Sequence, residues 1–222
     1  MAISEHPETT GQSDVSPWVG QRMTLDEFLA LPDEGSSLEY DDGVVTQKVA
    51  AKPVHGSFQS FLVRTIDQIA RSRRLGIVLP ETRFVTPNLA PVPDVLFYRR
   101  ERLAVRSAPD EFADPPDLAI EIVSPEQRLA VLMQKSLRYL AVGVRVVLVI
   151  APNDASVFEF RPDQPLHILQ GDDRMGLDDV LPGFEMTVRE LFEAVNWSWL
   201  DDPVSGAAED ASPDEASVPP QT

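Results

Sequence analysis

The sequence predicts a mixed α/β fold in which helices pack against one central sheet. Residues 54–73 carry apolar side chains at helical spacing, and Val144–Ile150 is a β-branched run that is typical of a strand. A further helical stretch separates the strand-like runs at 117–123 and 144–150. This order allows a right-handed crossover between parallel strands, and mixed elements of this kind pack as layers around one core.

The first elements are a short helix and a hairpin. Thr24 and Glu27 form a capping box before a helix that ends near Pro32. Strands at 38–40 and 44–49 flank a tight turn with the sequence Asp-Asp-Gly. The long helix at 54–73 follows, and its apolar residues predict one buried face.

Strands and two further helices fill the rest of the predicted domain. Strands are expected at 76–79, 82–86 and 92–98, followed by a loop at 99–116. A buried strand at 117–123 leads into a helix at 126–141, which ends near Gly143. After the run at 144–150, we expect a hairpin of strands 157–160 and 166–169 and a closing amphipathic helix at 187–195.

We expect a single folded domain at residues 21–200 between two disordered ends. Residues 1–20 are polar without apolar periodicity, and residues 201–222 form an acidic tail rich in Pro, Ala and Ser. Neither end can bury enough apolar surface to offset its chain entropy. The two ends hold nine of the 36 acidic residues and no Lys or Arg, which leaves 27 acidic against 19 basic residues in the domain, a net charge of −8.

The composition excludes several classes of protein. The chain has no cysteine, so it has no disulfide, no thiolate metal site and no cysteine nucleophile. It also lacks a Gly-rich phosphate loop and a Gly-x-Ser-x-Gly motif. No stretch approaches the roughly 18 apolar residues of a membrane span, and the N-terminus lacks the apolar region of a signal peptide. We therefore expect a cytoplasmic protein without membrane association.

Two carboxylates stand where the secondary-structure pattern does not require them. Asp94 follows Pro93 at a strand start, and Glu121 lies among apolar residues in the sequence LAIEIVS. A buried Glu is costly unless it is paired or binds a metal. The alternative is that Glu121 points to a solvated face, although its same-face neighbours Ala119 and Val123 do not suggest a fully wet one. Hydrolysis of a phosphodiester with Mg²⁺ requires carboxylates that hold the ion, and a nearby Lys can stabilise the transition state.

The ordered motifs resemble the Uma-type restriction endonuclease family of the PD-(D/E)xK nuclease superfamily. The resemblance covers about residues 22–194 and rests on MTLDEFLALP, LEYDDGVV, His55, VPDVLFY, PPDLAIEIVSPE, the run of Lys135, Tyr139 and Gly143, and LPGFEMTVRELF. It implies a restriction-endonuclease-like fold, a central mixed sheet flanked by helices. It also implies a DNA endonuclease that depends on Mg²⁺ or Mn²⁺.

The resemblance also implies four active-site residues. Glu39 would be an upstream acid that joins Asp94 and Glu121 as metal ligands. The superfamily usually places its Lys two residues after the Glu, where this chain has Val123. In this family that Lys appears on the following helix, which indicates Lys135; the alternative is a Lys on a solvated helix face.

The chain departs from the family pattern at three positions. Val131 replaces a common Asp, and Leu148 and Ala151 replace a Trp and a final Asp. These changes remove polar groups but leave the four candidates intact. A second hypothesis therefore stays open: a catalytically weak or inactive nuclease-fold protein that acts as a binding or assembly module.

DNA and a second copy of the chain are the expected partners. Two arginine clusters are candidate DNA contacts: Arg71, Arg73 and Arg74, and Arg99, Arg100, Arg102 and Arg106. The alternative is a solvated surface or a favourable charge at a helix C-terminus. His55 is either an auxiliary base or phosphate contact, or a locally bonded helix-start residue. Nucleases of this fold often act as homodimers, for which 157–160 and 197–200 are candidate contact segments.

Overall fold

The structure of the chain is a computed structural model that describes residues 15–32, 37–48, 51–103 and 112–198. Its centre is a six-stranded mixed sheet in the order β3-β5-β6-β7-β8-β9. The strands are β3 (Gly76–Pro80), β5 (Val95–Arg99), β6 (Leu118–Ile122), β7 (Val146–Ala151), β8 (Ser156–Phe160) and β9 (His167–Gln170). Only β6 and β7 pair in parallel, and they are joined through α3 (Leu129–Ala141). The predicted mixed α/β fold is confirmed.

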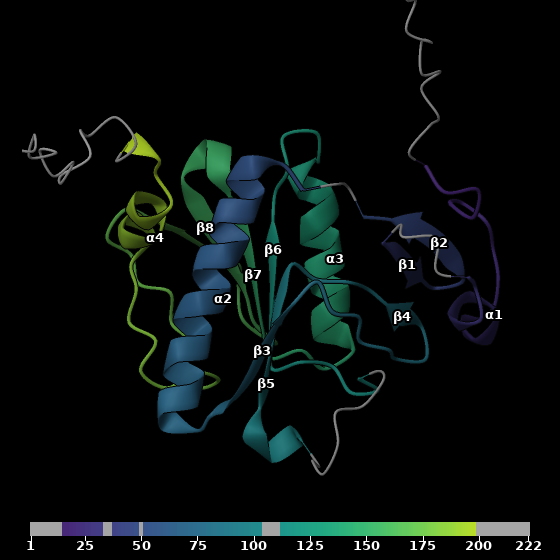
Figure 1. Cartoon of the computed structure of the whole chain (residues 1–222), viewed down its shortest axis with the longest axis horizontal. Helices are drawn as coiled ribbons and strands as arrows, with labels where there is room; N and C mark the ends of the chain where they lie inside the picture. The colour runs from purple at the N-terminus through teal and green to yellow at the C-terminus, as the bar shows by residue number, and fades with distance from the viewer. Residues whose placement is uncertain (1–14, 33–36, 49–50, 104–111, 199–222) are drawn as a thin grey trace, which may run out of the picture.

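Helices cover both faces of this sheet (Figure 1). On one face lie α2 (Pro53–Arg73) and α4 (Val188–Ala194). The buried row on α2 consists of His55, Phe58, Leu62, Ile66 and Ala70, a spacing of three to four residues that puts one helix face on the sheet. On the other face, α3 buries Leu132 and Tyr139 against the alternate side chains of the same strands.

A second, three-stranded sheet lies beside α3 (Figure 1). Its order is β2 (Val44–Gln47), β1 (Leu38–Asp41) and β4 (Leu89–Ala90), and α1 (Leu25–Leu29) packs on it through Phe28. The predicted capping box of Thr24 and Glu27 is present. Asp42 and Gly43 both have positive φ (47° and 87°), which is the requirement of a tight type I′ hairpin turn.

Three predicted elements have different boundaries. No strand forms at 82–86, where only single bridges link Phe84 to Phe112 and Thr86 to Leu89. The strand predicted from residue 92 begins at Val95, because Pro91 and Pro93 have no N–H to donate to a ladder. The helix predicted from residue 126 begins at Leu129, after a turn closed by Gln127 N–H and Ser124 O. Short 3₁₀ turns occupy Arg100–Arg102 and Pro152–Asp154.

The described fold extends to the N-terminal side of residue 21, where we placed the domain boundary. Ser16 N–H donates to Gln47 Oε1 at 2.8 Å, and Gly20 N–H donates to Val45 O at 2.8 Å. Residues 15–20 therefore run along β2. The remainder of the two ends predicted to be disordered, 1–14 and 199–222, lies outside the described residues. None of the described helices is long and apolar enough to cross a membrane.

Candidate active site

Asp94 lies at the start of β5, with its side chain only 1% exposed. Its Oδ2 accepts the backbone N–H of Ile122 at 2.6 Å and the His55 Nε2–H at 3.0 Å. Its Oδ1 lies 2.6 Å from Lys48 Nζ in a buried ion pair. One carboxylate oxygen is therefore fixed by two donors, while the other touches only a positive charge.

Glu121 lies beside Asp94, because β5 and β6 are adjacent and antiparallel with Val95 opposite Ile120. Its side chain is 3% exposed and points to the α3 face, where Tyr139 donates to its Oε1 at 2.6 Å. The alternative that Glu121 faces solvent is wrong. The alternation of β6 does turn Glu121 away from Ile120 and Ile122, but α3 covers the face to which it turns.

One face of α3 carries the basic residues that meet these acids. Lys135 Nζ lies 2.8 Å from Glu39 Oε1 and 2.9 Å from Glu121 Oε1, so it joins the small sheet to the central one. One turn further along α3, Arg138 pairs with Asp41. Because residues four apart share a helix face, Lys135 and Tyr139 both reach Glu121. The alternative that Lys135 lies on a solvated helix face is wrong.

Glu39 contacts two groups, the Lys135 ammonium and the backbone of the segment that follows β4. Its Oε1 also accepts the Val92 N–H at 2.7 Å. This bond holds β1 against the segment that leads into Asp94. Glu39 is therefore brought to the site, on the far side of Lys135 from Glu121.

A cavity of about 470 Å³ is lined by all four predicted residues, Glu39, Asp94, Glu121 and Lys135. Lys48, His55, Arg128 and Arg138 also line it. The cavity therefore presents both carboxylates and basic side chains to a ligand.

The acids and bases shift one another's protonation. Burial raises the pKa of Glu121, and the nearby charges of Asp94 and Glu39 raise it further against the opposing effect of Lys135. Burial also tends to raise the pKa of Asp94, but the His55 hydrogen bond and the Lys48 charge outweigh it and leave that pKa lowered. The pKa of Lys135 is raised, because its two carboxylate partners outweigh its burial. The site therefore favours the charged form of Lys135 and, of its acids, disfavours ionisation of Glu121 most clearly.

Three side chains of the site were missed or left undecided at the level of sequence. Lys48 was not singled out, although it is one of only three lysines in the chain. His55 is not locally bonded but reaches Asp94 across 39 positions of sequence. Tyr139 had no predicted role of its own. Its pKa is raised well above its ordinary value, because it is buried beside Glu121, so it remains a hydrogen-bond donor.

The donor chemistry fits a small, hard cation held by two carboxylates. Among the described residues, no group of three His, Asp or Glu side chains is arranged to hold a metal ion. Asp94 and Glu121 nevertheless lie at adjacent strand ends, and Asp94 Oδ1 faces a side-chain ammonium, Lys48, in place of a fixed backbone donor. Mg²⁺ commonly takes one or two carboxylates and keeps several waters.

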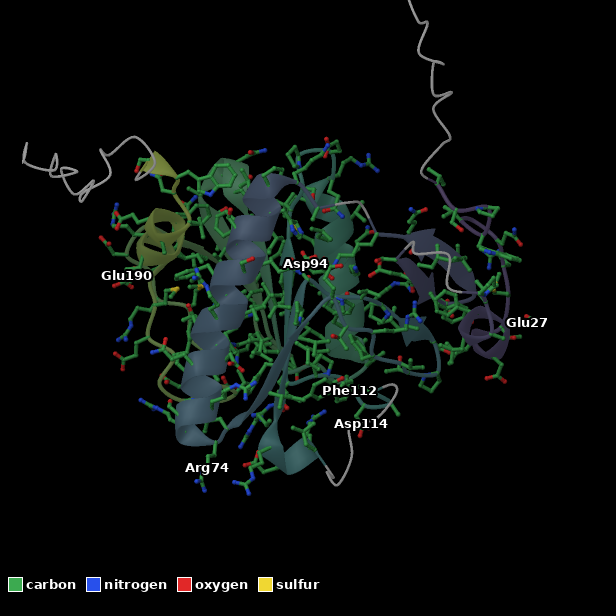
Figure 2. All side chains as sticks on the ribbon, in the orientation of Figure 1. Glu27, Arg74, Asp94, Phe112, Asp114 and Glu190 are labelled. Atoms are coloured by element: carbon green, nitrogen blue, oxygen red, sulfur yellow. The ribbon has the colours of Figure 1, made fainter. Side chains whose placement is uncertain are left out.

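The arginine clusters lie at the opposite end of the sheet. Figure 2 shows Arg74 at one end of α2 and Asp94 well away from it. Asp94 contacts the first two turns of α2 through His55 and Gln59. The second cluster follows the other end of β5, where Arg100 N–H donates to Leu75 O. Arg106 lies outside the described residues.

Most of these arginines already have partners. Arg71 pairs with Asp67, Arg99 with Glu101, and Arg102 with Asp117, and Arg73 donates to Pro182 O. The alternative that these clusters are ordinary surface charges therefore gains support, and the cavity has its own basic residues.

The two segments considered for a dimer contact differ in exposure. Residues 157–160 belong to β8, which is buried between β7 and β9, so this segment is wrong as a contact surface. Trp197 is exposed, and its indole N–H donates to Ser57 Oγ at 3.0 Å. Residues 199 and 200 lie outside the described part of the chain.

Comparison with known proteins identifies the family and the fold. Residues 25–189 match the Uma2 family, whose description is "Putative restriction endonuclease". A crystal structure from Anabaena variabilis, described as a putative nuclease belonging to DUF820, is 26% identical with a TM-score of 0.75, covering 78% of this chain and 99% of that one. No curated protein matches the chain. The chain therefore belongs to the Uma2 family of restriction-endonuclease-like proteins, and its fold is that of a nuclease.

Proposed function

We propose that this protein is a Mg²⁺-dependent DNA endonuclease of the PD-(D/E)xK type. The observation that carries the proposal is the pair of buried carboxylates, Asp94 and Glu121, at adjacent strand ends in a cavity that also contains Lys135. Burying two acids side by side destabilises a fold. This fold tolerates that destabilisation at a cavity that a ligand can enter, which is typical of a functional site.

The residues around Asp94 and Glu121 would hold these two acids in position for a bound ion. A bound Mg²⁺ would act as a Lewis acid toward a phosphate oxygen and would lower the pKa of a bound water. The Ile122 N–H and His55 fix Asp94 Oδ2, which leaves Oδ1 for the ion. Tyr139 holds Glu121 by its Oε1. These bonds orient the two acids before any ligand arrives, which lowers the cost of binding.

Lys135 is the cation of the proposed reaction. Its two carboxylate partners raise its pKa, which favours the charged form and a role as a cation. Its ammonium lies between Glu39 and Glu121, at the cavity, where it can stabilise the negative charge that develops on the phosphate. Glu39 anchors it from the small sheet, so we assign Glu39 a positioning role alongside its predicted role as a ligand.

Cleavage of supercoiled plasmid DNA with Mg²⁺ or Mn²⁺ tests the proposal. We expect Asp94→Asn and Glu121→Gln each to lower the rate by about 100-fold or more, because each removes a ligand of the catalytic ion. Asp117→Asn is the matched control, since Asp117 is equally buried but lies at the other end of β6. Equal cleavage by wild type, Asp94→Asn and Glu121→Gln would contradict the proposal.

A catalytically silent binding module is the second candidate. Its support is that Lys48 and Lys135 already neutralise both acids, in a chain whose net charge is −17. DNA binding that persists in Asp94→Asn, without cleavage by any variant, would favour it. We further propose a homodimer, because cutting two strands requires two sites; light scattering on the full chain measures this directly.

A further inference from the structure

Lys48 is a buried cation that the proposed reaction does not use. Its side chain is only 9% exposed, although it follows the end of β2 in the small sheet. It contacts two acids, Asp94 Oδ1 at 2.6 Å and Glu81 Oε1 at 3.4 Å. Its Nζ is therefore a buried ammonium placed between two carboxylates. Because a second carboxylate lies within 3.4 Å, the ammonium can leave Asp94 without losing every ionic partner.

The position of Lys48 coincides with the place a metal would take. Asp94 Oδ2 is already occupied by two N–H donors, so Oδ1 is the oxygen left for an ion. Lys48 Nζ stands against that oxygen. Two cations a few ångströms apart repel each other strongly in a poorly solvated site. A metal on Asp94 Oδ1 and Lys48 in its present place therefore exclude each other.

Glu81 offers the displaced ammonium a second partner. It lies next to β3, its N–H donates to Asp94 O at 3.2 Å, and its side chain is 41% exposed. Its backbone has a positive φ of 44°, an uncommon conformation for a residue other than Gly. Such a conformation is maintained where the surrounding structure requires it. The Glu81 carboxylate lies within reach of Lys48 in this conformation.

We infer that Lys48 is a tethered cation that occupies Asp94 Oδ1 in the metal-free protein and moves onto Glu81 when a divalent ion binds. The inference rests on the proposed metal-dependent function and adds its regulation. Lys48 neutralises the buried Asp94 until the ion arrives, so the empty site remains stable. The chain thereby competes with its own metal and lowers its metal affinity.

Two substitutions should change metal affinity in opposite directions. Lys48→Met removes the competitor and keeps the apolar length of the side chain, so Mn²⁺ should bind about tenfold tighter. Glu81→Gln removes the second partner of the ammonium, so Mn²⁺ should bind about threefold more weakly. In the double variant Lys48→Met/Glu81→Gln, the Glu81 change should have no further effect, because the residue it acts through is gone.

Calorimetric titration of the full chain with MnCl₂, at constant pH and ionic strength, measures all four affinities. Lys52→Met is the matched control, because Lys52 has the same charge but pairs with Glu126 at an exposed position. We expect it to change the affinity less than twofold. Circular dichroism verifies folding, and Lys48→Gln replaces Lys48→Met if the latter does not fold.

Each outcome has a distinct meaning. Asp94-dependent Mn²⁺ binding that is unchanged or weaker in Lys48→Met and Lys48→Gln overturns the inference and leaves the proposed function standing. An equal effect of Glu81→Gln with and without Lys48 overturns the move to Glu81. Binding that appears only when Lys48 is replaced supports the inference. No Mn²⁺ binding by any variant overturns the metal-dependent function and the inference with it.

Discussion

The two ends of β6 both bury a carboxylate, and the surroundings of the two acids differ. At the N-terminal end, Asp117 is 1% exposed, like Asp94 at the other end. Its Oδ2 accepts the Arg99 N–H at 2.8 Å, and its Oδ1 faces Arg102 at 3.3 Å and Arg145 at 3.9 Å. Both oxygens of Asp117 are thus occupied by donors or cations.

At the C-terminal end of β6, the acids interfere with one another. The charges of Asp94 and Glu39 raise the pKa of Glu121, and the buried His55 Nδ1 lacks a hydrogen-bond partner among the described residues. This end also opens into the cavity, whereas Asp117 is not among its lining residues. Burial of an acid is therefore weak evidence for function. Crowding of acids, unpaired polar atoms and access to a cavity together are the stronger indication.

The largest expected difference between the two ends of β6 is the contribution of their acids to the stability of the fold. Asp117→Asn should lower the free energy of unfolding by about 2 kcal/mol, because it removes a paired carboxylate. Glu121→Gln should raise it by about 1 kcal/mol, because it removes a crowded acid that serves ligand binding more than the fold. Urea denaturation in EDTA measures both values. A loss of stability in Glu121→Gln equal to that in Asp117→Asn would mean that the two ends are alike.

The contribution of Glu121 to stability should also depend on pH. The folded pKa of Glu121 is raised above its ordinary value of 4.5, so the folded chain keeps a proton that the unfolded chain loses. The associated stability is fully present below pH 4.5 and is lost as pH rises through the folded pKa. The stability gained by Glu121→Gln should therefore grow as pH rises from 4.5 through the folded pKa of Glu121.

Urea titrations at several pH values in EDTA measure this growth, with Glu126→Gln as an exposed control. Asp94 has the opposite sign. Its folded pKa is lowered, so its contribution is present above pH 3.8 and is lost as pH falls below that value. A pH-independent difference between wild type and Glu121→Gln would contradict the crowding of acids at this end.

The smallest effect concerns DNA. Arg128 is exposed and lines the cavity, whereas Arg74 lies at the far end of α2. Arg128→Ala should lower DNA affinity about threefold and reduce the slope of its salt dependence by about one, because it removes one phosphate contact. Arg74→Ala should leave both unchanged. Fluorescence anisotropy with duplex DNA in EDTA measures both affinities. A loss of affinity in Arg74→Ala but not in Arg128→Ala would indicate that DNA binds at the arginine clusters.

Much of the fold could be predicted because its determinants are local. The capping box at Thr24, the Asp-Gly turn at Asp42 and the apolar row of α2 act within a few residues of one another. The error at 82–86 has the opposite origin. That segment has the composition of a strand, but it turns back on Leu89 and Pro91 and finds no strand to pair with. Pairing of strands depends on partners that are remote in sequence.

The sequence by itself predicted the α/β fold, because apolar periodicity is a local property, and its resemblance to a nuclease family indicated Glu39, Asp94, Glu121 and Lys135 as site residues. Only the tertiary structure decided what surrounds them. Lys48 reaches the site from the end of β2, and His55 reaches it from α2, both across long stretches of chain. Electrostatic contacts depend on distance in space, and sequence spacing carries little information about it.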